Sequence, residues 1–594
     1  MFKCILSCSL SSIGEVMEEN VLIDDAAIGL FEYRADELIL SNNRDELIGF
    51  VSAIDKPFFF FDDDFIEARY FYTLANCYST VHGYYNTEWY SEDLSKAVIN
   101  YRKALYIIKS NAYPNANHIN LRSRIETNLA NWLSSQGRSL CCIPHWDTAI
   151  ELDANPVAII NKAENQLFIA RHIYDESHVC YHYFKAYQLI CLGLEYVDLL
   201  HDEQKIAYAE DGKFLDFKAW FESKFKLSDF DDYETFKDEA KTRKQRDYLT
   251  WCGDNRLFLN DLNDVSTDEI VYQDVFAMPS FSQTINTSLA MHEDLIYHGN
   301  FDEIKNDYCY ARYLIFSAQN IPTNQEHFFN TTYPHVDDLA HTITNLKAHH
   351  YKSAFRTLYS IFDKIAYFLN SFFDLNDVDA RVYFHNIFGE LKNGKLKPHK
   401  KLVDSQNCFV HALFYILKDI RDSNQKGVNL DTASKWLDPD AEAFSEIRNA
   451  MEHRSLKIVD EFGHSLTKHD IEFHKHLAEE LKDEAELLKS KLKDLYIDIA
   501  KAKKADDTVL KTELEQQKKQ LDSKLERVKE MIHDKQKRSS YSLLITDTEF
   551  ESRLFTLIKL VRNSIMYLSF AIHLDQLQKP DDGSLMMPMD VPLK

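Results

Sequence analysis

Residues 128–156, NLANWLSSQGRSLCCIPHWDTAIELDANP, decide the class of fold that this sequence predicts. Small and apolar side chains recur at helical spacing on both sides of Gly137, which predicts two helices joined by a turn at this glycine. Pro156 stands where the second helix should stop, because proline lacks the backbone N–H that a helix interior needs. The stretch is therefore predicted to form a helical hairpin.

A similar arrangement of small and aromatic side chains extends to both sides of this hairpin. Before it, residues 74–78 (LANCY) are followed by Ala97 and Tyr101, and after it residues 157–200 keep a helical spacing of apolar residues. The pattern resembles the tetratricopeptide repeat, although the first unit carries an insertion near residues 83–92 and the third is degenerate. A generic antiparallel helix bundle is the alternative. Both are helical stacks that suit the binding of a protein partner.

Composition and patterning predict an all-α protein of several domains. The chain has 594 residues but only 14 Gly and 12 Pro, the residues that most often interrupt helices. Within residues 470–538, Leu and Ile recur at heptad-like spacing in two series separated by Asp506-Asp507, which predicts an antiparallel coiled-coil hairpin. A long surface helix pair without a partner role is equally compatible. The predicted regions are 1–65 (a cap or connecting region), 66–204 (the repeats), 205–335 (a bridge of helices and ordered loops) and 336–594 (a helical domain with 470–538 inserted).

The charge and the cysteines exclude several classes of protein. A net charge of −26 argues against a broad basic surface that coats nucleic acid, so any RNA contact must be local. The ten cysteines form no CxxC pair, which argues against a zinc site and fits a reducing compartment. We find neither a secretory signal nor a membrane span, so the expectation is a cytoplasmic protein that makes no membrane contact.

The stretch Arg448-Asn449-Ala450-Met451-Glu452-His453 carries side chains that suit RNA cleavage without metal. Histidine transfers protons near neutral pH, arginine neutralises phosphate oxygens with a fork of donors, and asparagine can orient either group. Asn449 and His453 share one helical face, and Arg448 lies roughly 140° around the helix from His453. This spacing is also common on ordinary solvated helix faces. One copy supplies a single histidine, which suggests a site completed by a second copy of the chain.

The sequence resembles the HEPN superfamily, whose signature is Arg, usually a polar residue, and then His after four to six intervening residues. Arg448, Asn449 and His453 fit this signature. Residues 359–370 (YSIFDKIAYFLN) and 256–264 (RLFLNDLND) resemble the LA2681-like branch, in which the HEPN domain follows tetratricopeptide-like repeats. The resemblance covers about residues 248–594, and 66–200 more loosely. It implies a dimeric, metal-independent RNA endonuclease, often a defence or toxin effector.

Three features depart from that family pattern. The segment 470–538 is inserted between the motif and the last helix. HEPN toxins controlled by nucleotidylation carry Tyr two residues after the His, where this chain has Ser455, so we do not expect that control. The second Arg-Asn pair, Arg562-Asn563, has its next His at position 573, which is too distant for the signature. This pair is either structural or an auxiliary RNA contact.

Other candidate sites are weaker. His349-His350 and His464 lack carboxylates or cysteines at metal-ligand spacing. No Gly-rich phosphate loop is present, so we expect neither a metal nor a cofactor. The basic segments 392–401 and 535–538 could follow an RNA backbone or could be solvated surface.

The leading hypothesis is therefore an RNA endonuclease acting as a homodimer, with the repeats as a docking site for a protein partner. In this hypothesis His453 is the general acid or base, Arg448 stabilises the phosphate, and Asn449 orients the reacting groups. The alternatives are a non-catalytic scaffold and one subunit of a defence complex.

Overall fold

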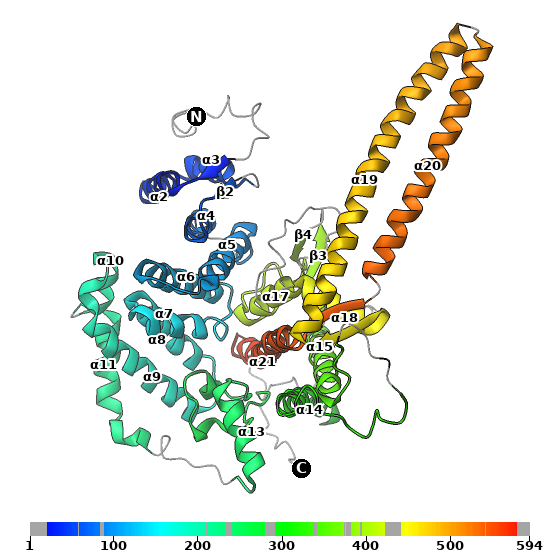
Figure 1. Cartoon of the computed structure of the whole chain (residues 1–594). Helices are drawn as coiled ribbons and strands as arrows, with labels where there is room; N and C mark the ends of the chain where they lie inside the picture. Colours follow the sequence, from blue (N-terminus) through cyan, green and yellow to red (C-terminus); the bar gives the residue numbers. More distant parts are fainter. Residues whose placement is uncertain are drawn as a thin grey trace. The chain divides into compact units, whose positions relative to one another are not determined.

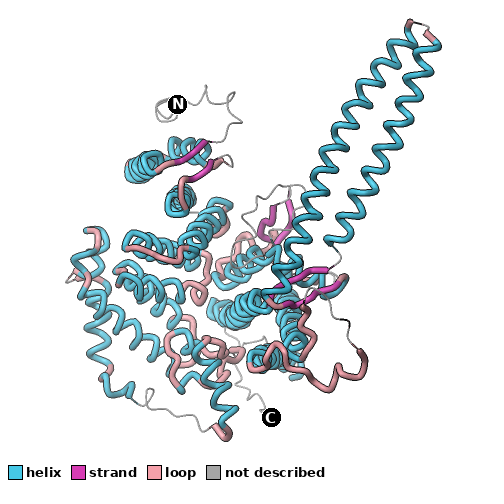
Figure 2. Tube along the Cα trace, in the orientation of Figure 1, coloured by secondary structure: helices cyan, strands magenta, loops and turns pink. Residues whose placement is uncertain are grey.

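The computed structural model is largely helical, which confirms the predicted all-α class (Figures 1 and 2). Its few strands form small two-stranded sheets within the described part. The structure describes residues 21–56, 59–83, 88–209, 211–231, 240–279, 291–334, 336, 341–373, 375, 382–392, 395–421, 441–505, 507–540 and 542–578.

The elements follow one another in this order: β1 (Val21–Ile23), α2 (Asp25–Leu40), α3 (Arg44–Ile54), β2 (Phe59–Phe61), α4 (Asp64–Gly83), α5 (Glu92–Ser110), α6 (Ala116–Ser135), α7 (Ile143–Asp153), α8 (Pro156–Ala170), α9 (Glu176–Glu195), η1 (Val197–Leu199), α10 (Asp202–Lys205), η2 (Ile206–Tyr208), α11 (Lys213–Lys224), η3 (Leu227–Phe230), α13 (Arg243–Asp254), η4 (Asp261–Asp264), η5 (Glu269–Val271), α14 (Met291–Gln319), α15 (Leu346–Phe372), α16 (Phe384–Ile387), β3 (Gly389–Lys392), β4 (Lys395–Pro398), α17 (Cys408–Arg421), α18 (Ala441–His453), β5 (Ser455–Val459), α19 (Glu461–Lys504), α20 (Thr508–Ser540), β6 (Ser542–Thr546) and α21 (Asp547–Gln578).

The chain divides into two compact units. Unit 1 consists of Met1–Tyr313, Thr357–Glu442 and Thr556–Lys594, and unit 2 consists of Leu314–Arg356 and Ala443–Phe555. Helices α14, α15, α18 and α21 contribute residues to both units.

In unit 1, the helices from α4 to α9 pack in consecutive pairs. Helix α4 contacts α5, α6 contacts α7, and α8 contacts α9, while α6 also touches both α4 and α8. Contacts with the next helix and with the next but one are typical of a helical-repeat array. The tetratricopeptide assignment itself stays a prediction.

The hairpin predicted around Gly137 is present in unit 1. Gly137 has a φ of 78°, and a Cβ added there would lie 2.1 Å from the Cys408 carbonyl oxygen, so both backbone conformation and space require glycine. Helix α7 ends at Asp153, and Asn155 caps α8 by accepting from the amides of Val157 and Ala158. The buried Trp146 indole donates to the Asn131 side chain (3.0 Å), which ties α7 to α6.

The segment 256–264 of unit 1 is an ordered loop whose polar side chains are buried. Asn260, Asp261, Asn263 and Asp264 are all nearly inaccessible to solvent. Asp261 accepts from His178 Nδ1 (2.8 Å) and faces His182 Nε2 (3.0 Å), so this carboxylate links the loop to helix α9. Burial would raise the pKa of Asp261, but the two histidines outweigh burial and lower it.

The same contact should make stability depend on pH. Burial would lower the pKa of His178, but its hydrogen bond to Asp261 and that residue's charge raise the pKa above the ordinary value. The stabilisation is therefore complete below the ordinary histidine pKa of about 6.5 and is lost as pH rises through the raised pKa of the folded state. We expect the difference in melting temperature between the wild-type and His178→Gln proteins to shrink with rising pH. A difference that stays constant or grows across this window would contradict the assignment.

Helix α21 is long and apolar enough to cross a membrane, but 83% of its apolar stretch is buried inside the protein. That burial is the pattern of a core helix. The helix is held by polar contacts as well, since the Tyr567 hydroxyl accepts from the amide of Leu140 (2.8 Å).

Unit 2 contains the motif helix α18 and the helical hairpin that follows it. Strands β5 and β6 pair in parallel, from Ser455 with Ser542 to Val459 with Thr546, and α19 and α20 connect them. Parallel strands need a long crossover connection, which the two helices provide here. Phe355 of α15 packs against two other helices of this unit. Its ring centroid lies 6.3 Å from that of Phe444 on α18 and 5.9 Å from that of Phe550 on α21.

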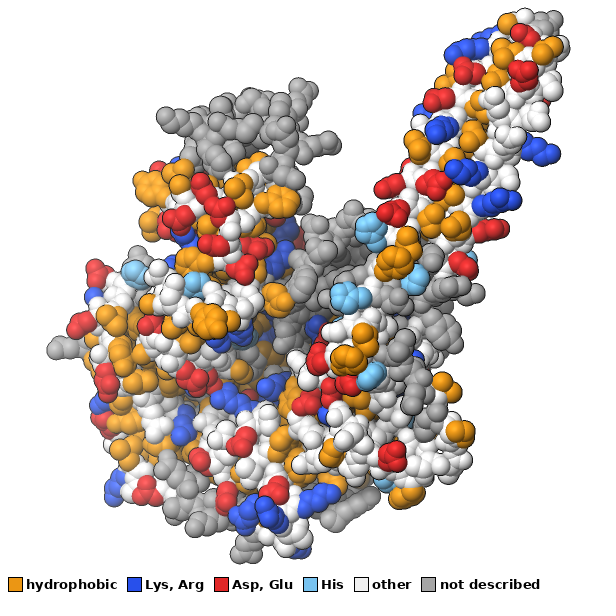
Figure 3. Space-filling view, in the orientation of Figure 1, with side chains coloured by type: hydrophobic (Ala, Val, Ile, Leu, Met, Phe, Trp, Pro, Cys, Tyr) orange, Lys and Arg blue, Asp and Glu red, His pale blue; other side chains and the backbone are white. Residues whose placement is uncertain are grey.

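Helices α19 and α20 lie side by side along a narrow apolar seam (Figure 1). The buried side chains of this seam are Ala485, Leu488, Leu492, Leu525 and Val528. Lys524 on α20 pairs with Glu484 on α19 at 2.9 Å. Figure 3 shows Lys, Arg, Asp and Glu side chains interspersed over the visible face of this hairpin, so neither sign of charge dominates there.

Candidate active site on helix α18

Helix α18 is amphipathic, and its pattern places the predicted motif in solvent. Phe444, Ile447 and Ala450 recur every third residue and are buried at 0–1% exposure. The helix ends at His453 because the next residues alternate in burial and form strand β5. The motif therefore occupies the last two turns of a helix that is fixed by its apolar side.

The structure brings the three predicted site residues to one exposed side of α18. Arg448, Asn449 and His453 are all exposed, and they span roughly 140° of the helix surface opposite the buried stripe. The Asn449 side chain donates to the Ser445 hydroxyl one turn earlier (3.5 Å). The histidine and arginine side chains are therefore accessible to solvent.

Sequence reasoning missed a second helix that contributes to this region. Arg356 on α15 donates through Nη2 to the Met451 carbonyl oxygen (2.9 Å), and its Nε lies 3.2 Å from Glu452 Oε1. Met451 is in the last turn of α18, where carbonyl groups lack helical partners and the helix dipole is negative. Arg356 therefore stabilises the end of the motif helix and balances the charge of Glu452 between Arg448 and His453.

Lys352, one turn before Arg356, extends the same cationic face of α15. Its ammonium donates to the carbonyl oxygen of Leu456 (2.7 Å), the second residue of β5. Burial, together with the neighbouring charge of Arg356, lowers the pKa of Lys352. The i, i+4 spacing of the two cations was visible in the sequence, but no local signal showed which helix they face.

The other histidine candidates lie on helices other than α18. His349 and His350 lie near the start of α15, and burial lowers the pKa of both. His464 lies in the first turn of α19. In the part of the chain that the structure describes, no group of three or more His, Cys, Asp or Glu side chains could hold a metal ion. The basic segments 392–401 and 535–538 lie largely outside the described side chains.

The second Arg-Asn pair is structural. Arg562 is 2% exposed, and its guanidinium pairs with Asp264 at 2.9–3.0 Å. It also donates to the carbonyl oxygens of Phe258 and Asn260. A side chain buried and paired in this way has no surface to offer an RNA.

Comparison with known families matches residues 289–492 to the family described as LA2681-like HEPN. No curated protein matches the chain, and no solved structure does. The matched residues include Lys352, Arg356 and the whole of α18, whereas the 256–264 loop and the repeat-like helices lie outside them. The comparison therefore supports a HEPN domain, of the LA2681-like kind, at residues 289–492.

Proposed function

We propose that this protein is a metal-independent RNA endonuclease of the HEPN type, with Arg448, Asn449 and His453 as its catalytic residues. The observation that carries the proposal is the exposure of these three side chains together, on one side of a helix inside the region that matches the HEPN family. HEPN domains are generally ribonucleases. A motif retained only for packing would lie on the buried stripe of α18.

The chemistry needs no redox partner or cofactor. The ribose 2′-oxygen forms a bond to the adjacent phosphorus while the bond from phosphorus to the 5′-oxygen breaks. The 2′-hydroxyl proton leaves to a base, and the departing 5′-oxygen takes up a proton. His453 performs one of these transfers, Arg448 balances the charge that develops on the phosphoryl oxygens, and Asn449 orients the phosphate.

A complete site needs two proton-transfer groups, and each chain contributes one His453. Pairing two copies of α18 across a twofold axis supplies both in one cleft. We therefore propose that the active form is a homodimer. We further propose that the repeat-like helices α4 to α9 dock a protein partner, and that the protein is a defence or toxin effector, as its resemblance to the HEPN family implies.

The direct test is incubation of the purified protein with labelled single-stranded RNA or tRNA in excess chelator. Cleavage that yields 2′,3′-cyclic phosphate and 5′-hydroxyl ends, together with a dimeric mass by light scattering, is the expected result. Activity that disappears with chelator and returns with a divalent metal would overturn the mechanism.

The Arg356–Glu452 ion pair gives a further prediction for substrate binding. Without Arg356, the carboxylate of Glu452 stands unbalanced beside the motif and repels RNA phosphates. Both side chains are about half exposed, so the pair contributes at most about 1 kcal/mol. We expect Arg356→Ala to weaken binding of a non-cleavable 2′-O-methyl RNA by up to about fivefold, and Glu452→Gln in the same protein to restore it.

Lys524→Ala provides the matched control for that prediction, because it breaks the exposed ion pair with Glu484 on the hairpin. It should leave RNA affinity unchanged. If Glu452→Gln fails to rescue Arg356→Ala, the role of Arg356 is limited to holding the end of α18.

The second candidate function is a non-catalytic scaffold, either alone or as a subunit of a defence complex. It is favoured by the repeat-like helices and the long hairpin, both of which present extended surfaces without a catalytic motif. A wild-type protein that never cleaves RNA, with partner binding intact in His453→Ala, would support the scaffold.

A further inference from the structure

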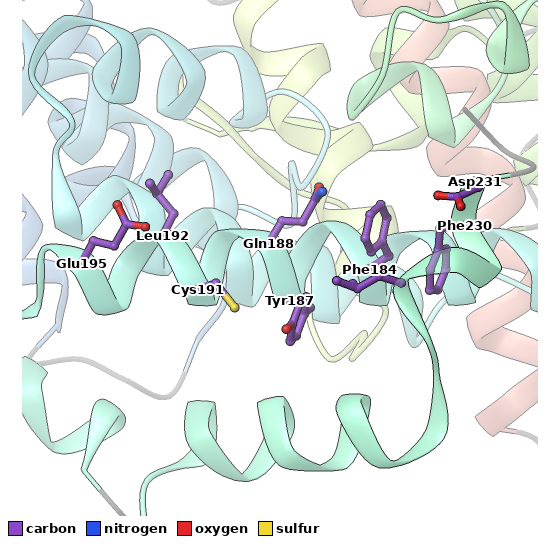
Figure 4. A pocket seen from close by; sticks show the side chains of 9 residues that line it. Phe184, Tyr187, Gln188, Cys191, Leu192, Glu195, Phe230 and Asp231 are labelled. Carbon is purple, nitrogen blue, oxygen red and sulfur yellow. The ribbon is translucent and has the colours of Figure 1, made fainter. Parts of the chain in front are cut away.

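A groove on helix α9 in unit 1 lies outside the candidate active site. It has a volume of about 590 Å³, within the range of small-ligand and side-chain pockets. Its lining follows one face of α9, at Phe184, Tyr187, Gln188, Cys191, Leu192 and Glu195, and is completed by Leu227, Phe230 and Asp231. Figure 4 shows Glu195 at one end of this stretch of helix and Phe230 with Asp231 at the other.

The floor of the groove is formed by stacked aromatic rings. The rings of Phe184 and Phe230 stack with centroids 4.4 Å apart, and Tyr187 stacks on Phe221 at 4.5 Å. Leu227 at the rim is 57% exposed. The exposed Leu227 and the aromatic rings below it form an apolar surface, which favours contact with apolar side chains of a ligand.

Both ends of the groove are acidic. Glu195 is the last residue of α9 and is exposed, and the last turn of this helix has no basic residue. A carboxylate at a helix C-terminus adds to the negative end of the helix dipole, which concentrates negative potential there. Asp231 is exposed at the opposite end. Lys185 on α9 lines a different pocket, with Arg256.

The length of the groove along α9 sets the length of the ligand. Phe184, whose ring stacks on Phe230 next to Asp231, lies about 16 Å along the helix from Glu195, at about 1.5 Å per residue. An extended peptide covers this distance in about five residues. Gln188 is exposed between the two ends and can both donate to and accept from a peptide backbone.

We propose that the α9 groove binds an extended peptide segment of a protein partner, with basic residues about five positions apart and an apolar side chain between them. Glu195 and Asp231 hold the two basic side chains, and Leu192, Leu227 and the aromatic edges hold the apolar one. This inference deepens the docking role in the proposed function, but it does not depend on RNA cleavage. Nucleic acid does not fit a groove closed by two carboxylates.

The test uses fluorescence polarisation of a fluorescein-labelled peptide, GRLSLSRG, with the full-length protein. We expect saturable binding that Glu195→Lys and Asp231→Lys each weaken at least tenfold. Glu176→Lys, on the same helix but outside the groove, should change the affinity less than twofold. The same composition with adjacent arginines (GRRLSLSG) should bind less tightly than the probe.

Equal binding of the probe to wild-type protein and to Glu195→Lys would overturn the proposal, as would the absence of saturable binding or competition by a single-stranded RNA. Both acidic residues are exposed, so we expect the lysine variants to fold. Melting temperatures equal to that of the wild type would show that they do. The His453→Ala protein should bind the peptide as the wild type does, so a failure of RNA cleavage and a failure of peptide binding remain separate results.

Discussion

A His453→Ala protein is expected to cleave RNA about 10²- to 10⁴-fold more slowly than the wild type, the usual contribution of a general acid or base. Removing the imidazole leaves Arg448 to bind the phosphate, so RNA affinity should fall much less than the cleavage rate. Arg448→Ala should lower both, and Arg448→Lys should restore affinity better than rate, because lysine keeps the charge but lacks the fork of donors. Single-turnover cleavage and binding of 2′-O-methyl RNA measure the two effects separately.

His533→Ala removes an exposed histidine from the hairpin and serves as the control. Its cleavage rate should equal that of the wild type. Adding excess His453→Ala protein to the wild type tests the proposed dimer, since exchange of subunits would form sites with a single histidine and lower the cleavage rate per wild-type chain. Wild-type rates in the His453→Ala protein would remove His453 from the mechanism.

An Arg562→Met protein is expected to lose about 3–5 kcal/mol of folding stability, the usual cost of leaving one partner of a buried ion pair alone. The substitution preserves much of the side-chain volume but removes every donor. Asp264 would keep a buried charge without its guanidinium, and the carbonyl oxygens of Phe258 and Asn260 would lose their bonds to Arg562. Urea denaturation followed by circular dichroism measures the loss.

Lys529→Met on α20 is the control for this second prediction. Lys529 pairs with Glu526 at 2.8 Å on the exposed surface of the hairpin, so its replacement should change stability by less than about 1 kcal/mol. If Arg562→Met instead kept full stability and lost RNA affinity, the pair Arg562-Asn563 would be an RNA contact after all.

The helical class and the accessible side of the motif could be predicted because both depend on local spacing. Three signals in the local sequence agree with the final structure. They are the small number of glycines and prolines, the turn at Gly137 and the break at Pro156. The exposure of Asn449 and His453 on one side of α18 follows from their separation by four residues together with the apolar stripe of Phe444, Ile447 and Ala450.

The remaining features depend on contacts between distant parts of the chain. The sequence left the role of Arg562 open between a structural contact and an RNA contact, because its partner, Asp264, precedes it by 298 residues. The contribution of Arg356 was hidden for the same reason, since its ion pair with Glu452 joins two helices. Strand β5 was missed because five residues of alternating burial are too short a signal until β6 supplies the partner strand.

The parallel pairing of β5 with β6 has a consequence for how this chain can vary among related proteins. The chain leaves β5 after Val459 and returns at Ser542, which lie at opposite ends of the paired strands, and the pairing holds both points in place. Equal numbers of helical turns can therefore be gained or lost from both arms of the hairpin while its two ends stay in place. Such a change in the length of the arm leaves the strand that follows His453 in place.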